Sequence, residues 1–415
     1  MAVAFTTTLD ARKLRADFPI FEQEFHGKPL AFLDSAASSQ KPRQVLDAMT
    51  RFYETSYANV HRGVYELAER ATEGLEHARE RCRAFVNAPA AHEIIFVRNA
   101  TEAINLVAYS WGLANLGPGD VVLVTELEHH ANFVPWQYIA GKTGAEFRML
   151  PVETDGTLHL EQLDELAGDG TVKVVATGYV SNVLGGSNDV PRIAAWAHER
   201  GAIHVCDAAQ AAPHKRVDVQ ALGTDFVAVS GHKMLGPSGI GFLWGRSELL
   251  RSMDPFLTGG HMIRRVRENE STWGELPHKF EAGTAPMAEA VGLGAAIDYL
   301  EAVGLEAIER HEHELVAYAL ERLAEIPGVT TWGPPPERRA GIVSFDVEGV
   351  HPHDVAQILD LDAVAIRAGH HCCQPLMHRL GVAATNRASF YLYTVPEEID
   401  RLAAGLWRVK ETFGV

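Results

Sequence analysis

Short apolar runs rich in valine and isoleucine alternate with helical stretches between about Glu93 and Trp244, and this alternation constrains the fold more than any other feature. The predicted strands are Glu93–Val97, Val121–Val124, Val172–Thr177, Ala202–Cys206 and Asp225–Val229. The intervening helices are predicted near Thr101, Ala131–Ala140 and Pro191–Glu199. This pattern indicates an α/β fold with a mostly parallel central sheet that is covered on both faces. In such sheets, ligands bind beyond the carboxyl ends of the strands.

The C-terminal part of the chain has a different pattern, which predicts a second, smaller α+β domain. Two long helices are followed by a turn-rich break, and then by strands and helices in alternation. The predicted elements are helices over Ala288–Ala302, Leu305–Ile326, His353–Asp360 and from Pro396, and strands over GIVSFDV, Val364–Ala368 and Ala388–Tyr393. We assign residues 29–290 to the large domain and residues 1–28 plus 291–415 to the small one.

The charge of the chain argues against nucleic-acid and membrane roles. Its 415 residues contain 54 Asp plus Glu and 37 Lys plus Arg, which gives a formal net charge of −17. An acidic surface of this kind repels phosphate backbones and anionic lipids. The four cysteines are too few for a disulfide scaffold, and we find neither a signal peptide nor a membrane-spanning stretch. We therefore expect a soluble cytoplasmic protein.

Polar residues follow several predicted strands. Asn99 or Thr101 is expected to cap a helix whose first N–H groups would bind an anion, although a plain N-cap is the commoner role. His129 and His130 follow the second strand, and Asn182 follows the third. A lone histidine is more often a surface or packing residue than a functional one.

The most informative pair is Asp207, directly after one strand, and Lys233, just past the next. Pyridoxal phosphate (PLP) needs a lysine for its Schiff base, an anion against its ring nitrogen, a flat partner for its ring and N–H donors for its phosphate. An Asp–Lys ion pair at the sheet edge is the structural alternative. Because all four requirements occur at successive strand ends, the sequence favours the cofactor.

The motifs as a set resemble the group II (SufS-type) cysteine desulfurases, which are fold-type-I, class-V aminotransferase-like PLP enzymes. Nearly the whole chain carries the resemblance, in the order LDSAASSQKP, NVHRGVY, NATEAINLVA, EHHANFVPWQ, SNVLG, CDAAQ, SGHKMLGPSGIGFLWG, FLTGGHMI, FEAGT, RAGHHC and NRASFYLY. The resemblance implies a fold-type-I PLP-dependent transferase, typically a homodimer, that converts L-cysteine to L-alanine.

The resemblance also implies roles for individual residues. Lys233 would form the Schiff base, Asp207 would bind the pyridine nitrogen, Gln210 the phenolate oxygen, and His129 would stack on the ring as a catalytic residue. The phosphate would be held by Thr101, Ser230 and His232, with Thr284 reaching in from a second subunit.

The substrate carboxylate is expected to meet the bidentate fork of Arg387, together with Asn182, which also contacts the cofactor. Arg367 is expected to bind substrate as well, and His61 and Arg62 to lie near the site.

Cys372 matches the cysteine that forms the persulfide in this family, and Arg367, His370 and His371 are expected to favour its thiolate. A buried inert cysteine is the structural alternative. Cys373 stands where the family usually has a small residue such as alanine, and we interpret it as a passive packing residue rather than a sulfur acceptor. No metal site is expected at the HHCC segment, because adjacent residues rarely converge on one tetrahedral centre.

The expected function is therefore PLP-dependent cysteine desulfuration with a persulfide on Cys372, which supplies sulfur for iron–sulfur cluster assembly. Selenocysteine is an expected second substrate. The acceptor would be a SufE-like or a zinc-scaffold SufU-like protein, which His353 would contact in the second case. The alternatives are a selenocysteine lyase or another class-V PLP enzyme, and a non-catalytic sulfur- or metal-binding scaffold.

Overall fold

The computed structural model describes residues 9–61 and 63–415 and contains a seven-stranded central sheet. The strand order is β4-β10-β9-β8-β7-β5-β6. The strands are β4 (Ile94–Val97), β5 (Asp120–Thr125), β6 (Glu146–Leu150), β7 (Thr171–Gly178), β8 (Ile203–Asp207), β9 (Phe226–Ser230) and β10 (Gly241–Gly245). β10 is antiparallel to both of its neighbours, and the remaining pairs are parallel. The predicted mostly parallel sheet is confirmed.

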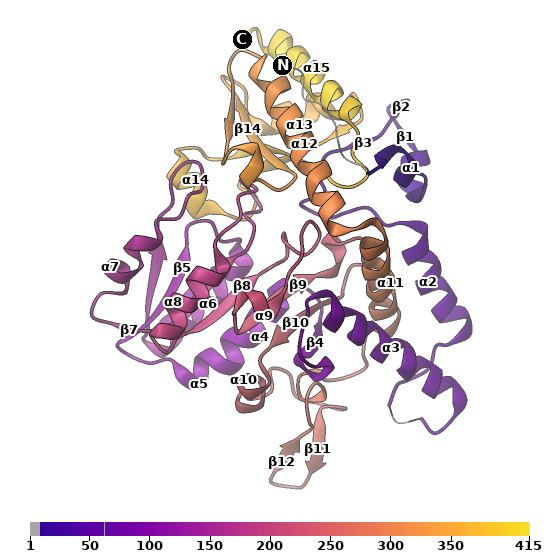
Figure 1. Ribbon diagram of the computed structural model, residues 1–415, viewed down its shortest axis with the longest axis vertical. Coiled ribbons are helices and arrows are strands. Elements are labelled where there is room, and N and C mark those ends of the chain that lie inside the picture. Colours follow the sequence, from indigo (N-terminus) through magenta and orange to yellow (C-terminus); the bar gives the residue numbers. More distant parts are fainter. Residues whose placement is uncertain (1–8, 62) are drawn as a thin grey trace.

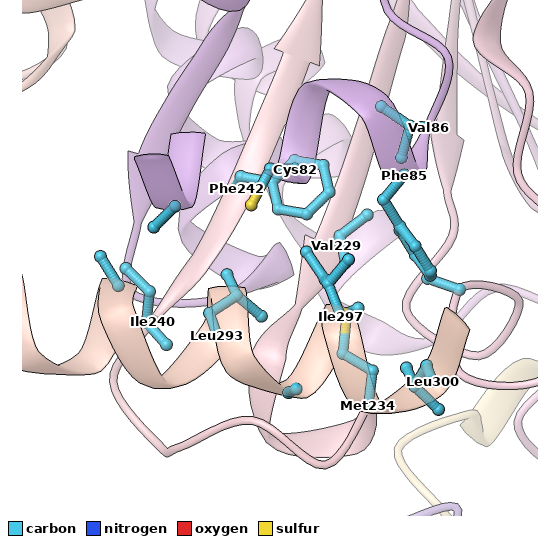
Figure 2. Packing of buried hydrophobic residues seen from close by; sticks show 14 of the residues in the cluster. Cys82, Phe85, Val86, Val229, Met234, Ile240, Phe242, Leu293, Ile297 and Leu300 are labelled. Carbon is cyan, nitrogen blue, oxygen red and sulfur yellow. The ribbon is translucent and has the colours of Figure 1, made fainter. Parts of the chain in front are cut away.

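Helices cover both faces of this sheet, as the apolar strands predicted. Phe226 and Ala228 of β9 pack in the hydrophobic cluster beneath α4 and α6, whereas Val227 and Val229 pack in the cluster beneath α3 and α11. The longer helices of this part are α2 (Arg43–Thr55), α3 (Glu66–Phe85), α4 (Ala100–Val107), α6 (Val134–Thr143), α8 (Val190–Glu199) and α11 (Met287–Val303). In Figure 2, Leu293, Ile297 and Leu300 of α11 lie against the strands.

Shorter elements connect these layers. The short α-helices are α5 (Leu113–Asn115), α7 (Leu163–Ala167), α9 (Val219–Leu222) and α10 (Ser247–Ser252). One segment, η3 (Ala108–Gly112), is π-helical. The 3₁₀ segments are η1 (Pro19–Glu22), η2 (Ala91–Glu93), η4 (His130–Asn132), η5 (Leu160–Gln162), η6 (Gly231–Lys233), η7 (His278–Phe280) and η8 (Pro336–Arg338). The hairpin of β11 (Ile263–Val266) and β12 (Ser271–Trp273) projects from the end of the molecule opposite to α15 (Figure 1).

The C-terminal part has its own four-stranded antiparallel sheet, in the order β13-β14-β17-β16. Its strands are β13 (Val329–Trp332), β14 (Ile342–Val347), β16 (Arg367–Gly369) and β17 (Thr385–Ser389). Its helices are α12 (Leu305–Ala324), α13 (Pro352–Asp360), α14 (Gln374–Leu380) and α15 (Pro396–Phe413). A separate apolar cluster lies between this sheet and α12, α13 and α15. This arrangement agrees with the expected smaller α+β unit.

The N-terminal segment packs on this smaller unit. Beyond α1 (Ala11–Arg15), the hairpin of β1 (Glu24–Phe25) and β2 (Lys28–Pro29) leads to β3 (Ala31–Phe32), which pairs in parallel with β15 (Val364–Ala365). Arg15 forms an ion pair with Glu398 of α15 at 2.9 Å. The predicted boundary at residue 290 falls within α11, whose buried side chains pack with the large unit. The division into domains stays a prediction.

Two predicted strands were wrong in their extent. The run Val364–Ala368 is divided between two sheets, because β15 pairs with β3 whereas β16 pairs with β17. The run Ala388–Tyr393 continues the strand only to Ser389, since Tyr391 and Thr394 form a tight turn in which each bonds to the other. In the described part of the chain, no helix combines the length and the apolar character needed to cross a membrane.

Candidate active site

A cavity of about 290 Å³ lies at the carboxyl edge of the central sheet, where the parallel strands were expected to bring polar residues together. All the site residues predicted from the sequence line it except Thr284. They are Thr101, His129, Asn182, Asp207, Gln210, Ser230, His232, Lys233, Arg367, Cys372 and Arg387. His61 does not line the cavity, and Arg62 lies outside the described residues. Thr284 is exposed on its own chain, so its role in a second subunit stays a prediction.

Lys233 and Asp207 lie on neighbouring strand ends. Asp207 ends β8 and is opposite Ala228 in the register of β9, and Lys233 ends η6, which directly follows β9. Burial lowers the pKa of Lys233 to about 8, although the negative charge of Asp207 works in the opposite direction. Burial raises the pKa of Asp207. The hydrogen bond from the amide N–H of Ala209, at 2.9 Å, and the positive charge of Lys233 lower this pKa and offset part of the rise. An amine with a lowered pKa beside a buried acid is typical of a reactive centre.

His129 presents a neutral, flat ring to the cavity. Its Nδ1 accepts a hydrogen bond from the N–H of Ala131 at 3.0 Å, so the proton of the neutral ring is on Nε2. Burial, together with the positive charge of Lys233, lowers the pKa of His129 to about 3. The ring therefore carries no charge at neutral pH and is suited to stacking on an aromatic group.

The N-terminus of α4 forms one end of the cavity. Asn99 is the N-cap, because its side chain accepts the N–H of Glu102 at 3.0 Å, and the alternative cap Thr101 instead lines the cavity. Ser230 accepts the N–H of Ala100 at 2.9 Å, which places a hydroxyl beside the helix start. Backbone N–H groups and hydroxyls at a helix N-terminus suit an anion such as phosphate.

Two arginines share one carboxylate at another side of the cavity. Arg387 approaches Asp34 Oδ1 at 3.3 Å, and Arg367 approaches Asp34 Oδ2 at 2.8 Å. Arg387 also donates to the carbonyl oxygen of Asn182 at 2.8 Å, while its buried Nε has no hydrogen-bond partner. The side chain of Arg387 is 4% exposed and that of Arg367 is 50% exposed. Arg387 is thus the buried cation with hydrogen-bonding capacity left for a ligand.

The segment that carries Cys372 is held in an unusual backbone conformation. His371 and Cys372 have φ values of 51° and 55°, in the left-handed region that non-glycine residues seldom adopt. Asn182 donates to the carbonyl oxygen of His371 at 2.7 Å, and the N–H of His130 donates to that of Cys372 at 2.7 Å. Such strained conformations persist where the surrounding contacts hold the backbone in place, and they often occur at functional sites.

The two adjacent cysteines lie in different environments. Cys372 is exposed and lines the cavity, whereas Cys373 is fully buried in the cluster with Leu376 and Met377. Burial raises the pKa of Cys373 well above its usual range. Because the thiolate is the reactive form, Cys373 is a poor nucleophile.

One expected aid to the Cys372 thiolate was wrong. His371 is buried and bonded to Thr385 at 2.9 Å, and burial lowers its pKa to about 3, so its ring is neutral rather than basic. The charge of Cys372 interacts with those of Lys233 and Arg387.

Sequence reasoning missed Asp34 and Glu128. Glu128 is buried against the cavity, where its oxygens accept hydrogen bonds from Thr125 at 2.7 Å and Asn132 at 2.6 Å. Burial, with a smaller effect of the charge of Asp207, raises its pKa to about 7. Both residues lie inside motifs that had been noted, LDSAASS and ELEHHAN, and a carboxylate beside an apolar strand was the available signal.

Taken together, the doubly covered sheet and the Lys233–Asp207 pair at its carboxyl edge define a PLP-dependent enzyme of fold type I. Residues 31–402 match the model of the aminotransferase class-V family, and the chain belongs to that family.

Named relatives support this assignment. The chain is 54% identical over 406 residues to a probable cysteine desulfurase of Halalkalibacterium halodurans, with 98% of this chain and 99% of the relative covered. It is 51% identical over 412 residues to one of Streptomyces coelicolor, with 98% of each covered. The resemblance to cysteine desulfurases is confirmed.

Solved structures agree. The cysteine desulfurase CsdA of Escherichia coli, in an S-sulfonic acid form, superposes with a TM-score of 0.90 at 38% identity, with 97% of this chain and 99% of that chain covered. The apo cysteine desulfurase of Thermococcus onnurineus gives 0.91 at 38% identity, with 99% and 100% covered.

Proposed function

We propose that this chain is a PLP-dependent cysteine desulfurase that converts L-cysteine to L-alanine and retains the sulfur as a persulfide on Cys372. The observation that carries the proposal is that Lys233, Asp207 and the exposed Cys372 line one cavity. An enzyme that only transaminates or epimerises has no use for an exposed thiol beside its lysine. Relatives at 54% and 51% identity are named probable cysteine desulfurases, which supports the proposal.

The residues present fit the cofactor. Gln210 lines the cavity with a buried side-chain oxygen that has no hydrogen-bond partner, an acceptor that a donor group of a ligand would satisfy. Its Nε2 donates to the carbonyl oxygen of Ala36 at 2.6 Å and would bind the cofactor's phenolate oxygen with its second hydrogen. Lys233 would hold PLP covalently, Asp207 would hold the proton on its ring nitrogen, and His129 would stack on its ring. Thr101, Ser230 and His232 would hold its phosphate. When bound, PLP supplies an electron-withdrawing ring that stabilises negative charge at the substrate Cα.

The chain's own groups then account for the remaining steps. The neutral amine of Lys233 takes the proton from the substrate Cα, and Arg387 binds the substrate carboxylate with its unpaired guanidinium N–H. Asn182 lines the cavity and donates one of its two amide hydrogens to the carbonyl oxygen of His371, which holds the Cys372 segment. Its second amide hydrogen would bind the substrate carboxylate.

Cys372 takes the sulfur. Its thiolate attacks the sulfur of the substrate, a new S–S bond forms, and the C–S bond breaks with its electron pair left on the substrate Cβ. A proton added at Cβ, and the return of a proton from Lys233 to Cα, complete alanine. Overall, L-cysteine and the enzyme thiol give L-alanine and the enzyme persulfide, so that atoms and electrons balance without an external oxidant.

The exposed position of Cys372 also supports delivery of the sulfur to another protein. We assign that delivery to iron–sulfur cluster assembly in the cytoplasm, with a SufE-like or zinc-scaffold acceptor. Selenocysteine is a second substrate in this proposal, since selenium leaves carbon more readily than sulfur. The enzyme would work as a homodimer in which Thr284 completes the phosphate site of the second subunit.

Alanine release tests the proposal. Wild-type protein incubated with L-cysteine and a thiol reductant should form alanine over many turnovers. Cys372→Ala should form almost none, whereas the matched control Cys373→Ala should retain most of the activity, because only Cys372 lines the cavity. If Cys372→Ala released alanine at the wild-type rate, the proposed role of this thiol would be wrong.

A further inference from the structure

Three histidines from distant segments converge outside the cavity described above. His61 lies in the loop before α3, His261 lies just before the β11–β12 hairpin, and His278 begins η7 just after it. One ring nitrogen of each lies within 4.8 Å of one ring nitrogen of the other two. The ring centroids are 4.9 Å apart for His61 and His261, 4.8 Å for His61 and His278, and 5.1 Å for His261 and His278.

Two of the three rings carry a buried nitrogen atom that has no hydrogen-bond partner. His61 Nε2 and His278 Nδ1 are shielded from solvent and have no hydrogen-bond partner. Buried polar atoms are normally paired, so two such atoms in one cluster require an explanation.

The backbone positions two of these side chains at a cost. His61 has a φ of 67° and His261 a φ of 73°, both in the left-handed region. A backbone of this kind is sparsely populated by non-glycine residues and occurs often where a side chain is directed at a ligand. Two such residues in a cluster of three are not expected of rings that merely pack together.

The charges around the cluster suit a cation. Glu76 Oε1 lies 3.8 Å from His61 Nε2, and the charge of Glu281 acts on both His61 and His278. Arg79 forms ion pairs with both carboxylates, at 3.0 Å to Glu76 and 2.7 Å to Glu281, and holds them in place. Two carboxylates against one guanidinium leave a net negative charge beside the three rings.

We propose that His61, His261 and His278 form a binding site for a divalent transition-metal ion of the zinc class. Three imidazoles are a common zinc ligand set, and a water molecule or Glu76 would complete a tetrahedron. Zinc–nitrogen distances of about 2.0–2.1 Å would bring the nitrogens to about 3.3 Å apart, so each ring would move by about 1 Å.

The metal would join three parts of the chain. His261 and His278 flank the β11–β12 hairpin, and His61 belongs to the loop between α2 and α3 (Figure 1). Thr284 lies in the segment between η7, which His278 begins, and α11. Its neighbour Gly283 donates a hydrogen bond to the carbonyl oxygen of Gly260, next to His261, at 3.0 Å. A bound ion would therefore fix the base of the hairpin and the loop that bears Thr284.

Zinc binding to the untagged, full-length holoenzyme tests this proposal. After treatment with a chelator, equilibrium dialysis against Zn²⁺ with elemental analysis should find one tightly bound ion per chain. His261→Gln and His278→Gln should each weaken that binding by more than about 10-fold. Co²⁺ in place of zinc should give the intense visible bands of a tetrahedral site, and both variants should lose them.

Two matched controls separate this site from others. His77→Gln removes an exposed histidine of α3 near the cluster, and Cys372→Ala removes the exposed thiol. Both should bind zinc as the wild type does. Thermal melting in chelator should be alike for all these proteins, while added zinc should raise the melting temperature only where all three histidines are present. The proposal is overturned if zinc binding is absent, if it survives both histidine substitutions, or if it is lost with Cys372.

Discussion

The substitution Arg387→Lys is expected to raise the KM for L-cysteine with little change in kcat. Lysine keeps a positive charge near Asp34, so the buried carboxylate is not left without a partner. It loses the planar fork, and with it the N–H that the structure leaves unpaired at Arg387 Nε.

The size of the effect follows from the bond that is lost. A hydrogen bond to a charged group contributes about 1.5–3 kcal/mol, which corresponds to a change of about 10- to 150-fold in KM. The bond to the substrate carboxylate is the same before and during the reaction, so kcat should change little. Arg387→Ala would be a poorer test, because it leaves Asp34 with only the half-exposed Arg367.

Steady-state alanine production at varied L-cysteine concentration measures both constants. The matched control is Arg379→Lys, whose side chain is 38% exposed and pairs with Glu126 outside the cavity, so its KM should be close to that of the wild type. Circular dichroism and melting curves establish that both variants are folded. If Arg387→Lys had an unchanged KM and a strongly reduced kcat, Arg387 would not be the carboxylate-binding residue.

Four further outcomes are expected. Lys233→Ala should abolish both activity and the visible absorbance of covalently bound PLP, as measured on the purified protein; retained covalent absorbance would show that another lysine holds the cofactor. Cys373→Ala should lower the free energy of unfolding by about 1 kcal/mol, because it removes a fully buried sulfur; denaturant titration measures this change. A loss of alanine production with unchanged stability would contradict the passive role of Cys373. The apoprotein should bind PLP covalently at a rate that rises with pH up to about 8 and then levels, because only neutral Lys233 reacts. Stopped-flow absorbance measures this rate, and a rate that does not depend on pH would contradict the lowered pKa of Lys233. Since this pKa is lowered from 10.5 to about 8, the unfolded chain binds more protons between these values, so the free energy of unfolding of the apoprotein should rise with pH across that window relative to Lys233→Ala.

Five of the seven strands of the central sheet could be predicted because they are continuous apolar runs, which a doubly covered parallel sheet requires. Strand β6 was missed because Glu146 and Arg148 interrupt its apolar residues. The strand ends then placed Asp207 and Lys233 correctly at one cavity. Strand β10 was not singled out, since its residues Gly241–Gly245 begin and end with glycine and run antiparallel within an otherwise parallel sheet.

Contacts between segments far apart in the sequence could not be predicted, because they depend on tertiary packing that no local pattern encodes. Asp34 bridges Arg367 and Arg387 across more than 300 positions of sequence, and nothing local marks it as their partner. The neutrality of His371 likewise follows from its burial against Thr385, whereas the sequence shows only a polar GHHC context.

Mapping the sulfur after a single turnover tests the central claim most directly. Holoenzyme mixed with less than one equivalent of L-cysteine, alkylated and digested, should yield a peptide with one additional sulfur on Cys372, in an amount equal to the alanine released. An additional sulfur on Cys373 with an unmodified Cys372, or alanine released without any protein-bound sulfur, would contradict the account.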